Sequence, residues 1–176
     1  AASSGVVVTG TNGTGSVSVK ISNYTNGTHR YKVAVNRATT NANGEIDYSQ
    51  TKVKVPADSQ PNITKLFAKP KTVSIAPRSA KTVTLTYKLP AKPIVGIVLG
   101  GVNVTCLDAD TSTTSGLSSQ VAYVTAVQLQ PGKTVPHFTP DLKLKNASTT
   151  VASNGVQVYA NVSNPLPVIQ SKMTVT

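Results

Sequence analysis

Residues 72–106 carry the feature that most restricts the fold, an alternation of apolar and polar side chains that proline interrupts three times. Val83, Leu85 and Tyr87 alternate with threonine and lysine, which is the period-two pattern of a strand with one buried face. Pro77 ends a shorter alternating run before it, because proline has a fixed φ and no N–H to donate. The pattern predicts two strands joined by a turn.

The most apolar run of the chain, IVGIVLGGV at residues 94–102, follows a bend bracketed by Pro90 and Pro93. It is shorter than the ~20 apolar residues that a membrane-spanning helix requires. Its length fits a strand or a hairpin that is buried on both faces. We therefore expect this run to lie in the core, with the other strands packed around it.

Turn signals divide the rest of the chain into short segments. Asn26-Gly27 predicts a type I′ turn in a hairpin over residues 16–36, and Asn43-Gly44 and Asn154-Gly155 predict further tight turns. We further predict a short strand at Val53 and Val55, and one helical turn or a packed loop at residues 63–67. Residues 111–119 are predicted to form a surface loop. A strand is predicted over residues 121–129, with a bulge at Tyr123-Val124.

Short strands separated by turns every ~8–12 residues are typical of an all-β fold. We predict an immunoglobulin-like β-sandwich with a short additional β segment at the C-terminus. The chain has a single cysteine, Cys106, and no tryptophan. The Cys, Trp and Cys pattern of true immunoglobulin domains is therefore absent, and the prediction concerns the architecture alone.

The sequence pattern changes at Pro131-Gly132, where a segment rich in proline follows the alternating strands, and this change predicts a domain boundary. Residues 1–130 are expected to form one domain, and residues 131–176 a linker and the first strands of a truncated second β domain. Two or three strands are too few for independent stability. The segment is therefore expected to pack on the first domain, to pair with another copy, or to begin a domain that continues. Because the alternation runs on through Met173 and Val175, we expect the chain to be part of a longer protein.

The charge is strongly basic and unevenly distributed. The 176 residues carry a net charge of +11, and no acidic residue lies between Asp58 and Asp108. Such a surface attracts polyanions; the alternative is that lysines keep a β-protein soluble and protect its edges. Nucleic acid is not the expected partner, because basic and aromatic residues do not interleave on one strand. The candidate ligand contacts are Lys69, Lys71, Arg78, Lys81 and Lys88.

No catalytic or cofactor motif is present, so we expect a protein that is not an enzyme and holds no cofactor. The oxygen-bearing side chains at Asn41, Asn43, Glu45 and Asp47 are spaced by two, but they lack the glycine and glutamate positions of a calcium loop. The paired aspartates at 108 and 110 are too short a signal for a metal site. Cys106 is in phase with Val102 and Val104, which predicts a small buried apolar residue.

The tyrosines allow two interpretations. Tyr24, Tyr31 and Tyr48 with neighbouring asparagines would suit a sugar-stacking platform. In the other interpretation, Tyr31 and Tyr87 are in phase with core positions and are structural.

The segment VSIAPRSAKTVTLTYKLPAKPIVGIVLGGV (73–102) resembles the signature of the WxL-interacting proteins of Gram-positive bacteria. ATTNANGEIDYS (38–49) resembles the turn upstream in that family. YVTAVQLQ (123–130), PDLKLKNA (140–147) and VQVYANVSNPLP (156–167) resemble its link to a second domain and that domain's first strands.

The resemblance implies a peptidoglycan-binding immunoglobulin-like domain on the extracellular bacterial surface, with WxL-domain proteins as partners. It further implies a membrane anchor, expected to be absent from this chain, and a second domain that binds host extracellular proteins. The predicted function is thus non-enzymatic recognition of peptidoglycan or an associated anionic wall polymer. The alternatives are a structural or assembly protein that pairs exposed strands with a partner or itself, and a wall hydrolase.

Overall fold

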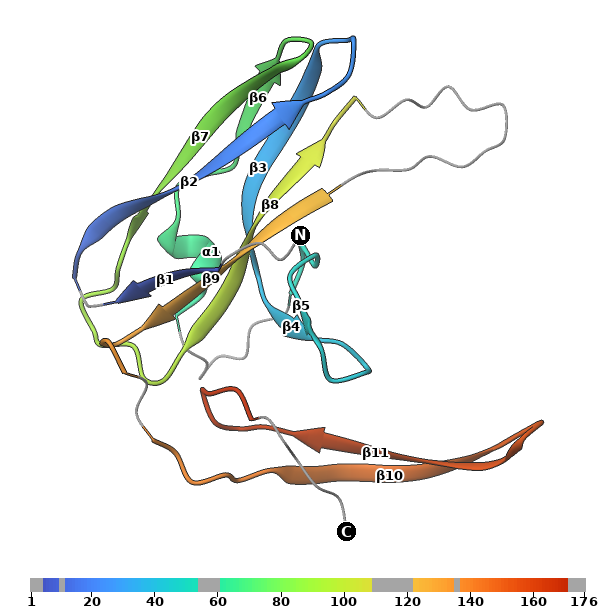
Figure 1. Cartoon of the computed structure of the whole chain (residues 1–176). Helices are drawn as coiled ribbons and strands as arrows, with labels where there is room; N and C mark the ends of the chain where they lie inside the picture. The colour runs from blue at the N-terminus through green and yellow to red at the C-terminus, as the bar shows by residue number, and fades with distance from the viewer. Residues whose placement is uncertain (1–4, 10–11, 54–60, 109–121, 135–136, 171–176) are drawn as a thin grey trace.

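The computed structural model describes residues 5–9, 12–53, 61–108, 122–134 and 137–170 (Figure 1). The one helix among these residues has a single turn, so the prediction of an all-β chain is confirmed, and no helix there is long and apolar enough to cross a membrane. The elements are β1 (Val6–Thr9), β2 (Thr14–Asn23), β3 (His29–Arg37), β4 (Thr39–Thr40), β5 (Ile46–Asp47), α1 (Ile63–Leu66), β6 (Lys71–Ile75), β7 (Ser79–Lys88), β8 (Val98–Cys106), β9 (Ala122–Gln130), β10 (Lys143–Ala152) and β11 (Gly155–Ser163).

Two sheets enclose the core. One has five strands in the order β1-β9-β8-β3-β6, and the other consists of β2 and β7. All pairs are antiparallel except β1 with β9, which is parallel and places β1 at the sheet edge. In Figure 1 the β2–β7 pair lies in front of β3 and β6. The predicted strands at 72–76 and 82–89 are confirmed as β6 and β7.

The core forms where the alternating apolar positions of the two sheets meet. Val17 and Leu85 come from the two-stranded sheet, Val33 and Val127 come from the five-stranded sheet, and all four are buried in one cluster. The helical turn α1 adds Ile63, whose side chain is 0% exposed. Burial of each such side chain contributes about 1.5–3 kcal/mol to folding, so the alternation in the sequence supplies the main force that holds the sheets together.

The predicted hairpin over residues 16–36 is wrong. β2 pairs with β7, whereas β3 pairs with β6 and β8, so the two strands belong to different sheets. Gly27 also lacks the positive φ that a type I′ turn requires. The chain therefore crosses from one sheet to the other between β2 and β3. It crosses again between β6 and β7, at the same end of the two sheets (Figure 1).

Asn23 explains why the chain crosses here instead of forming a hairpin. Its side chain is 1% exposed, and its amide nitrogen donates to the carbonyl oxygens of Gly27, Ile75 and Ala76 at 2.8, 3.0 and 3.1 Å. Its oxygen accepts from the N–H and the hydroxyl of Thr25. One buried amide thus joins both sheet-crossing turns, and burying it without these bonds would be costly.

The run at residues 94–102 is partly strand. β8 begins only at Val98, after the bend, but then lies between β3 and β9 with both faces covered, as expected. Gly100 and Gly101 permit this packing, because the side chain of Ile63 lies over the first and that of Tyr48 over the second. The predicted bulge at Tyr123-Val124 is wrong, since the register between β8 and β9 has no shift from Ala122 to Leu129. Residue 55, the loop 111–119 and residues 173–175 lie outside the described residues.

The C-terminal strands β10 and β11 form an antiparallel hairpin, and the predicted turn at Asn154-Gly155 is confirmed. One face of the hairpin is apolar and exposed to solvent: Leu144, Val151, Val156, Val158 and Val162 are 51–83% exposed. The segment after β11 touches the first part of the chain, where the N–H of Ile97 donates to the Pro167 carbonyl oxygen at 2.7 Å. The domain boundary near residue 131 stays a prediction.

Candidate functional site

All five predicted basic contacts are exposed, but the structure does not bring them together. Arg78 lies in the turn between β6 and β7, and Lys81 lies near it at the start of β7. Lys88 lies at the other end of β7, about 23 Å along the strand from Lys81 at ~3.3 Å per residue. Lys81 and Lys88 are seven positions apart in β7. Because side chains alternate between the two faces of a strand, these two lysines start from opposite faces of the sheet.

Two of the five basic residues have structural partners. The Lys71 ammonium donates to the Thr84 carbonyl oxygen at 2.6 Å and so joins β6 to β7. The Arg78 guanidinium donates to the Asn26 side-chain oxygen at 2.9 and 3.1 Å, and the backbone of Arg78 has a φ of 54°. Within the described residues, Lys69, Lys81 and Lys88 make no such bond. Of the five candidates, these three are the ammonium groups most available to an anion.

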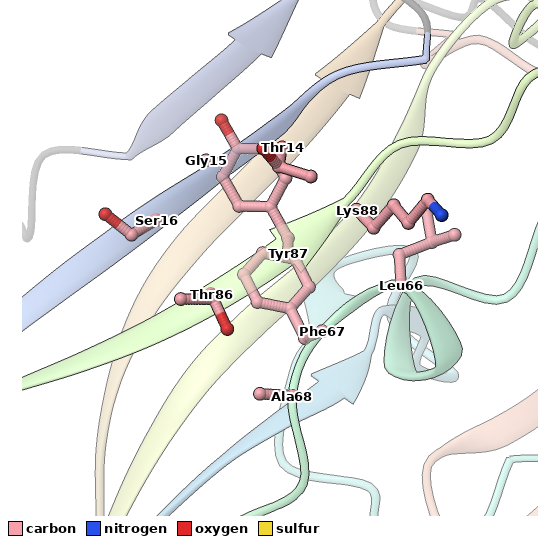
Figure 2. A pocket seen from close by; sticks show the side chains of 9 residues that line it. All are labelled: Thr14, Gly15, Ser16, Leu66, Phe67, Ala68, Thr86, Tyr87 and Lys88. Carbon is pink, nitrogen blue, oxygen red and sulfur yellow. The ribbon is translucent and has the colours of Figure 1, made fainter.

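A shallow groove of about 450 Å³ lies beside Lys88, at the end of the sheets away from the two crossing turns (Figure 2). Three segments that are distant in the sequence form it: the start of β2, the end of α1 with the residues after it, and the end of β7. Lys69 follows directly after the lining segment. The lining residues are Thr14, Gly15, Ser16, Leu66, Phe67, Ala68, Thr86, Tyr87 and Lys88.

Tyr87 is the central side chain of the groove (Figure 2). It pairs with Gly15 across β2 and β7, and a Cβ at Gly15 would lie 2.5 Å from its ring carbon Cζ. Only glycine therefore leaves room for the ring to lie across the neighbouring strand. Its other neighbour is the ring of Phe67, at a centroid distance of 5.3 Å and an angle of 50°, which is a favourable tilted arrangement.

Hydrogen bonds fix the segment after α1 to β7, so the groove is built before any ligand arrives. The N–H of Ala68 donates to the Thr86 carbonyl oxygen at 2.8 Å, and Phe67 forms an isolated bridge with Tyr87. The Lys71 bond to Thr84 continues this contact. On the other side, Asn62 begins α1 by accepting from the N–H of Thr64 at 3.1 Å, and this cap holds Leu66 beside the groove.

The predicted tyrosine platform is not assembled as expected. Asn23 and Asn36 are buried, and the Asn36 side chain donates to the carbonyl oxygens of Tyr48 and Ser49. Tyr24 is 78% exposed beside the crossing turns. Tyr31 packs against the core, and burial raises its pKa. The neighbouring amides are therefore committed to the fold.

The acidic residues have structural roles as well. Asp108 accepts from the Arg30 guanidinium at 2.6 Å and from its N–H at 2.5 Å, and these bonds lower the pKa of the carboxyl group. Asn41 accepts from the N–H groups of Asn43 and Glu45 in the β4–β5 turn. No cluster of three or more His, Cys, Asp or Glu side chains that would hold a metal occurs among the described residues, and Cys106 is half-buried.

The sequence alone did not identify the groove. In the alternating pattern of the strand, Tyr87 occupies a position that predicts a core residue, and its side chain does pack against the core. Its relation to Gly15 depends on the pairing of β2 with β7, which places residues 72 positions apart side by side. A glycine in an otherwise regular alternating strand was the available signal, because it indicates that another group approaches closely.

The model of one protein family, described as the peptidoglycan binding domain of WxL interacting proteins, matches residues 8–106. This is more than half of the chain. The chain belongs to this family. The match extends from β1 to the end of β8 and includes every residue that lines the groove. The family is described as a binding domain of the bacterial wall polymer and not as an enzyme, and the resemblance seen in the sequence is confirmed.

Solved structures that the comparison matches to this chain include the class 5 fimbriae chaperone CfaA. It is 16% identical, with a TM-score of 0.46, and the match covers 90% of this chain and 64% of that chain. A chain of the CsuC–CsuE chaperone–tip adhesion subunit pre-assembly complex of Acinetobacter baumannii is 12% identical with a TM-score of 0.45, and the match covers 91% of this chain and 69% of that chain. The PapD-like domain 7 of human CEP192 is 10% identical with a TM-score of 0.39, and the match covers 72% of this chain and 81% of that chain. The chain thus spans less than two thirds of the length of the CfaA chain. No curated protein matches the sequence.

Proposed function

We propose that this chain is a non-enzymatic module of the bacterial cell surface that docks onto peptidoglycan or an associated anionic wall polymer. The observation that carries the proposal is the family match over residues 8–106, which contain the groove. We further infer that the two facing sheets form an immunoglobulin-like sandwich, and that the module cooperates with WxL proteins, as the family description implies.

Electrostatic attraction supports this function. The net charge of +11 includes Lys69 beside the groove and Lys88 within it, and both ammonium groups lack a partner among the described residues. A polyanion close to this surface feels the attraction over about a Debye length, ~8 Å at physiological salt. Lys81 and Arg78 extend the positive charge toward the other end of β7. They serve as secondary contacts, with Lys71 acting mainly as a brace between the strands.

Binding to purified cell-wall sacculi, measured by co-sedimentation, tests the proposal. We expect binding to weaken steeply between low salt and about 1 M salt, where the Debye length falls to ~3 Å. A Lys69→Gln/Lys88→Gln variant should bind about threefold to tenfold more weakly, since each exposed contact contributes ~0.2–1 kcal/mol. The matched control is Lys32→Gln/Lys145→Gln, which removes the same charge from two exposed sites elsewhere. Binding that changes neither with salt nor with the Lys69→Gln/Lys88→Gln substitutions would contradict the proposal.

A second candidate function is assembly through the exposed hairpin. The apolar side chains of β10 and β11 lie on one face, and the register shift between Leu144 and Asn146 keeps Leu144 on that face with Val162. A second copy of the chain offers an identical face, so two hairpins would bury each other's apolar side chains. Light scattering should then show a dimer that Val158→Lys converts to a monomer. A monomer at every concentration would eliminate this candidate.

A further inference from the structure

Strand β2 has a neighbouring strand on one side only. Its ten residues run antiparallel to β7 in one unbroken register, from Thr14 opposite Lys88 to Asn23 opposite Ser79. These two strands make up the whole of the smaller sheet. The far side of β7 contacts the residues that follow α1, whereas no described strand lies along the far side of β2. β2 is therefore an open sheet edge.

Two hydrogen bonds fix which backbone groups of β2 face this edge. The Thr86 carbonyl oxygen accepts from the N–H of Ala68 at 2.8 Å, so it points away from β2. The Gly13 carbonyl oxygen accepts from the N–H of Leu89 at 2.7 Å, so it points toward β7. Because successive residues of a strand point their backbone groups to opposite sides, the odd residues of β2 bond to β7 and the even residues face outward. The outward groups belong to Thr14, Ser16, Ser18, Lys20 and Ser22.

The outward side of β2 has little to keep another strand away. Proteins block open edges with prolines, bulges or several charges. β2 contains no proline, its register with β7 has no shift, and its one charged residue is the exposed Lys20. An added strand could therefore lie along all of β2, over about 33 Å at ~3.3 Å per residue.

The larger sheet extends past β2 on the same open side. The bond of Lys71 joins β6 to β7, so β2 lies further toward β8 and β9 in the order of the larger sheet. Tyr123 and Val127 share the inner face of β9, because side chains alternate along a strand, yet Tyr123 is 70% exposed and Val127 is 0% exposed. Val19, which points inward from β2, is only partly buried. In Figure 1 the ends of β8 and β9 near the crossing turns extend past the free side of β2. A third strand beside β2 would cover this part of the larger sheet.

We propose that the open edge of β2 is a docking site for an acidic, extended segment of a partner protein, which joins the smaller sheet as its third strand. The pairing dictates the side chains of this segment. Those opposite Val17 and Val19 turn inward over Tyr123 and are apolar. Those opposite Ser18 and Lys20 face solvent and are polar, with a carboxylate beside the Lys20 ammonium group. Backbone bonds then supply affinity, and the alternating side chains supply specificity.

The charge of the chain selects this occupant. A second copy also carries +11, so two copies that meet edge to edge repel each other, whereas an acidic segment is attracted. The interaction goes beyond binding to the cell wall, because it requires a polypeptide backbone and no saccharide. It holds whether or not the chain binds peptidoglycan.

Amide hydrogen exchange of the full chain, followed by NMR, tests the open edge directly. In dilute free protein we expect the even-numbered amides of residues 16–22 to exchange rapidly and the odd-numbered amides of residues 17–21 to exchange slowly. The probe is a short synthetic peptide in which valine alternates with threonine and aspartate. At saturation it should slow exchange of the even-numbered amides by at least about tenfold. Two control peptides should not do so: one of the same composition without the alternation, and one N-methylated at alternate residues so that it cannot donate to β2.

Variants of β2 test the two named contributions. Ser18→Pro removes one outward N–H that β7 does not use, and it should weaken peptide binding at least about tenfold. Ser18→Ala keeps that N–H and is the matched control, so it should bind like the unmodified chain. Lys20→Glu should weaken the acidic peptide about two- to tenfold and strengthen a peptide with lysine in place of aspartate. Lys145→Glu, at an exposed position of β10, is the control for charge. Circular dichroism verifies that each variant is folded.

Each outcome decides for or against the docking site. Slow exchange of the even-numbered amides in dilute free protein would overturn it, because the edge would already be paired. Protection that rises with protein concentration, together with a dimer in light scattering, would assign the edge to a second copy and overturn the acidic partner. A peptide that protects no amide of β2, or that protects them equally when N-methylated, would overturn strand pairing. Protection by the alternating peptide alone, with the effects of Ser18→Pro and Lys20→Glu, would support the assignment.

Discussion

Tyr87 and Gly15 face each other across β7 and β2, and the tyrosine ring occupies the space that any side chain at position 15 would need. This relationship follows from the pairing of the two strands, which brings residues 72 positions apart side by side. It also makes position 15 a sensitive probe of how the Tyr87 ring packs, although the glycine itself has no side chain.

Gly15→Val is expected to push the Tyr87 ring out of its place. The Cβ would lie 2.5 Å from Cζ of the ring, so the ring must rotate and lose its contact with Phe67. We expect a loss of about 1–3 kcal/mol in the free energy of unfolding, as for other overpacked sites. Urea denaturation measures this loss. Ser18→Val, at an exposed position of the same strand, should cost much less, and an unaffected Gly15→Val would refute the packing argument.

Asn23→Ala should be among the most destabilising polar substitutions in the described chain. It removes a buried amide that bonds to three carbonyl oxygens and leaves those of Ile75 and Ala76 without this donor. We expect a loss of about 3 kcal/mol in urea denaturation. The control Asn26→Ala lies in the same turn but is exposed and bonds to the side chain of Arg78, so its cost should stay below about 1 kcal/mol. Equal costs for both would show that Asn23 does not hold the crossing turns.

Gly96→Ala is expected to release the segment that follows β11. Gly96 has a φ of 72°, and its Cβ would collide with the carbonyl oxygen of Pro167, which accepts from Ile97. Limited proteolysis should therefore cut residues 137–170 several-fold faster, while the rate of cleavage within β2, β3, β7 and β8 stays unchanged. Gly132→Ala is the control, because a Cβ there meets nothing within 4 Å. An unchanged cleavage pattern would mean that the contact does not fix the hairpin.

The ion pair of Asp108 with Arg30 predicts a dependence of stability on pH. Hydrogen bonds from Arg30 lower the pKa of Asp108 below its ordinary value of 3.8. A carboxyl group with a lowered folded-state pKa stabilises the fold above pH 3.8 and loses this contribution as the pH falls through the folded-state value. Asp108→Asn should thus have a slightly lower melting temperature at pH 7, with a difference from the unmodified chain that shrinks below pH 3.8. A difference that is constant with pH would argue against the ion pair.

The positions of the strands followed from the sequence, because side chains alternate with a period of two and proline ends the pattern. This local rule located β6, β7 and the C-terminal hairpin, and it placed the 94–102 run in the core. The same rule failed at Asn26-Gly27, where a turn signal predicted a hairpin. The donors of Asn23 find their partners at Ile75 and Ala76, some fifty residues away, and no local pattern contains that information.

The sequence by itself therefore determined which residues face the core and how strongly positive the surface is, since both depend on composition and on neighbours along the chain. Only the tertiary structure decided which strands pair, and with them the groove, because Gly15, Phe67 and Tyr87 meet through hydrogen bonds between distant backbones. It also separated the basic residues that the sequence had grouped. Lys71 and Arg78 donate hydrogen bonds to acceptors in the fold, whereas Lys88 is exposed at the end of β7.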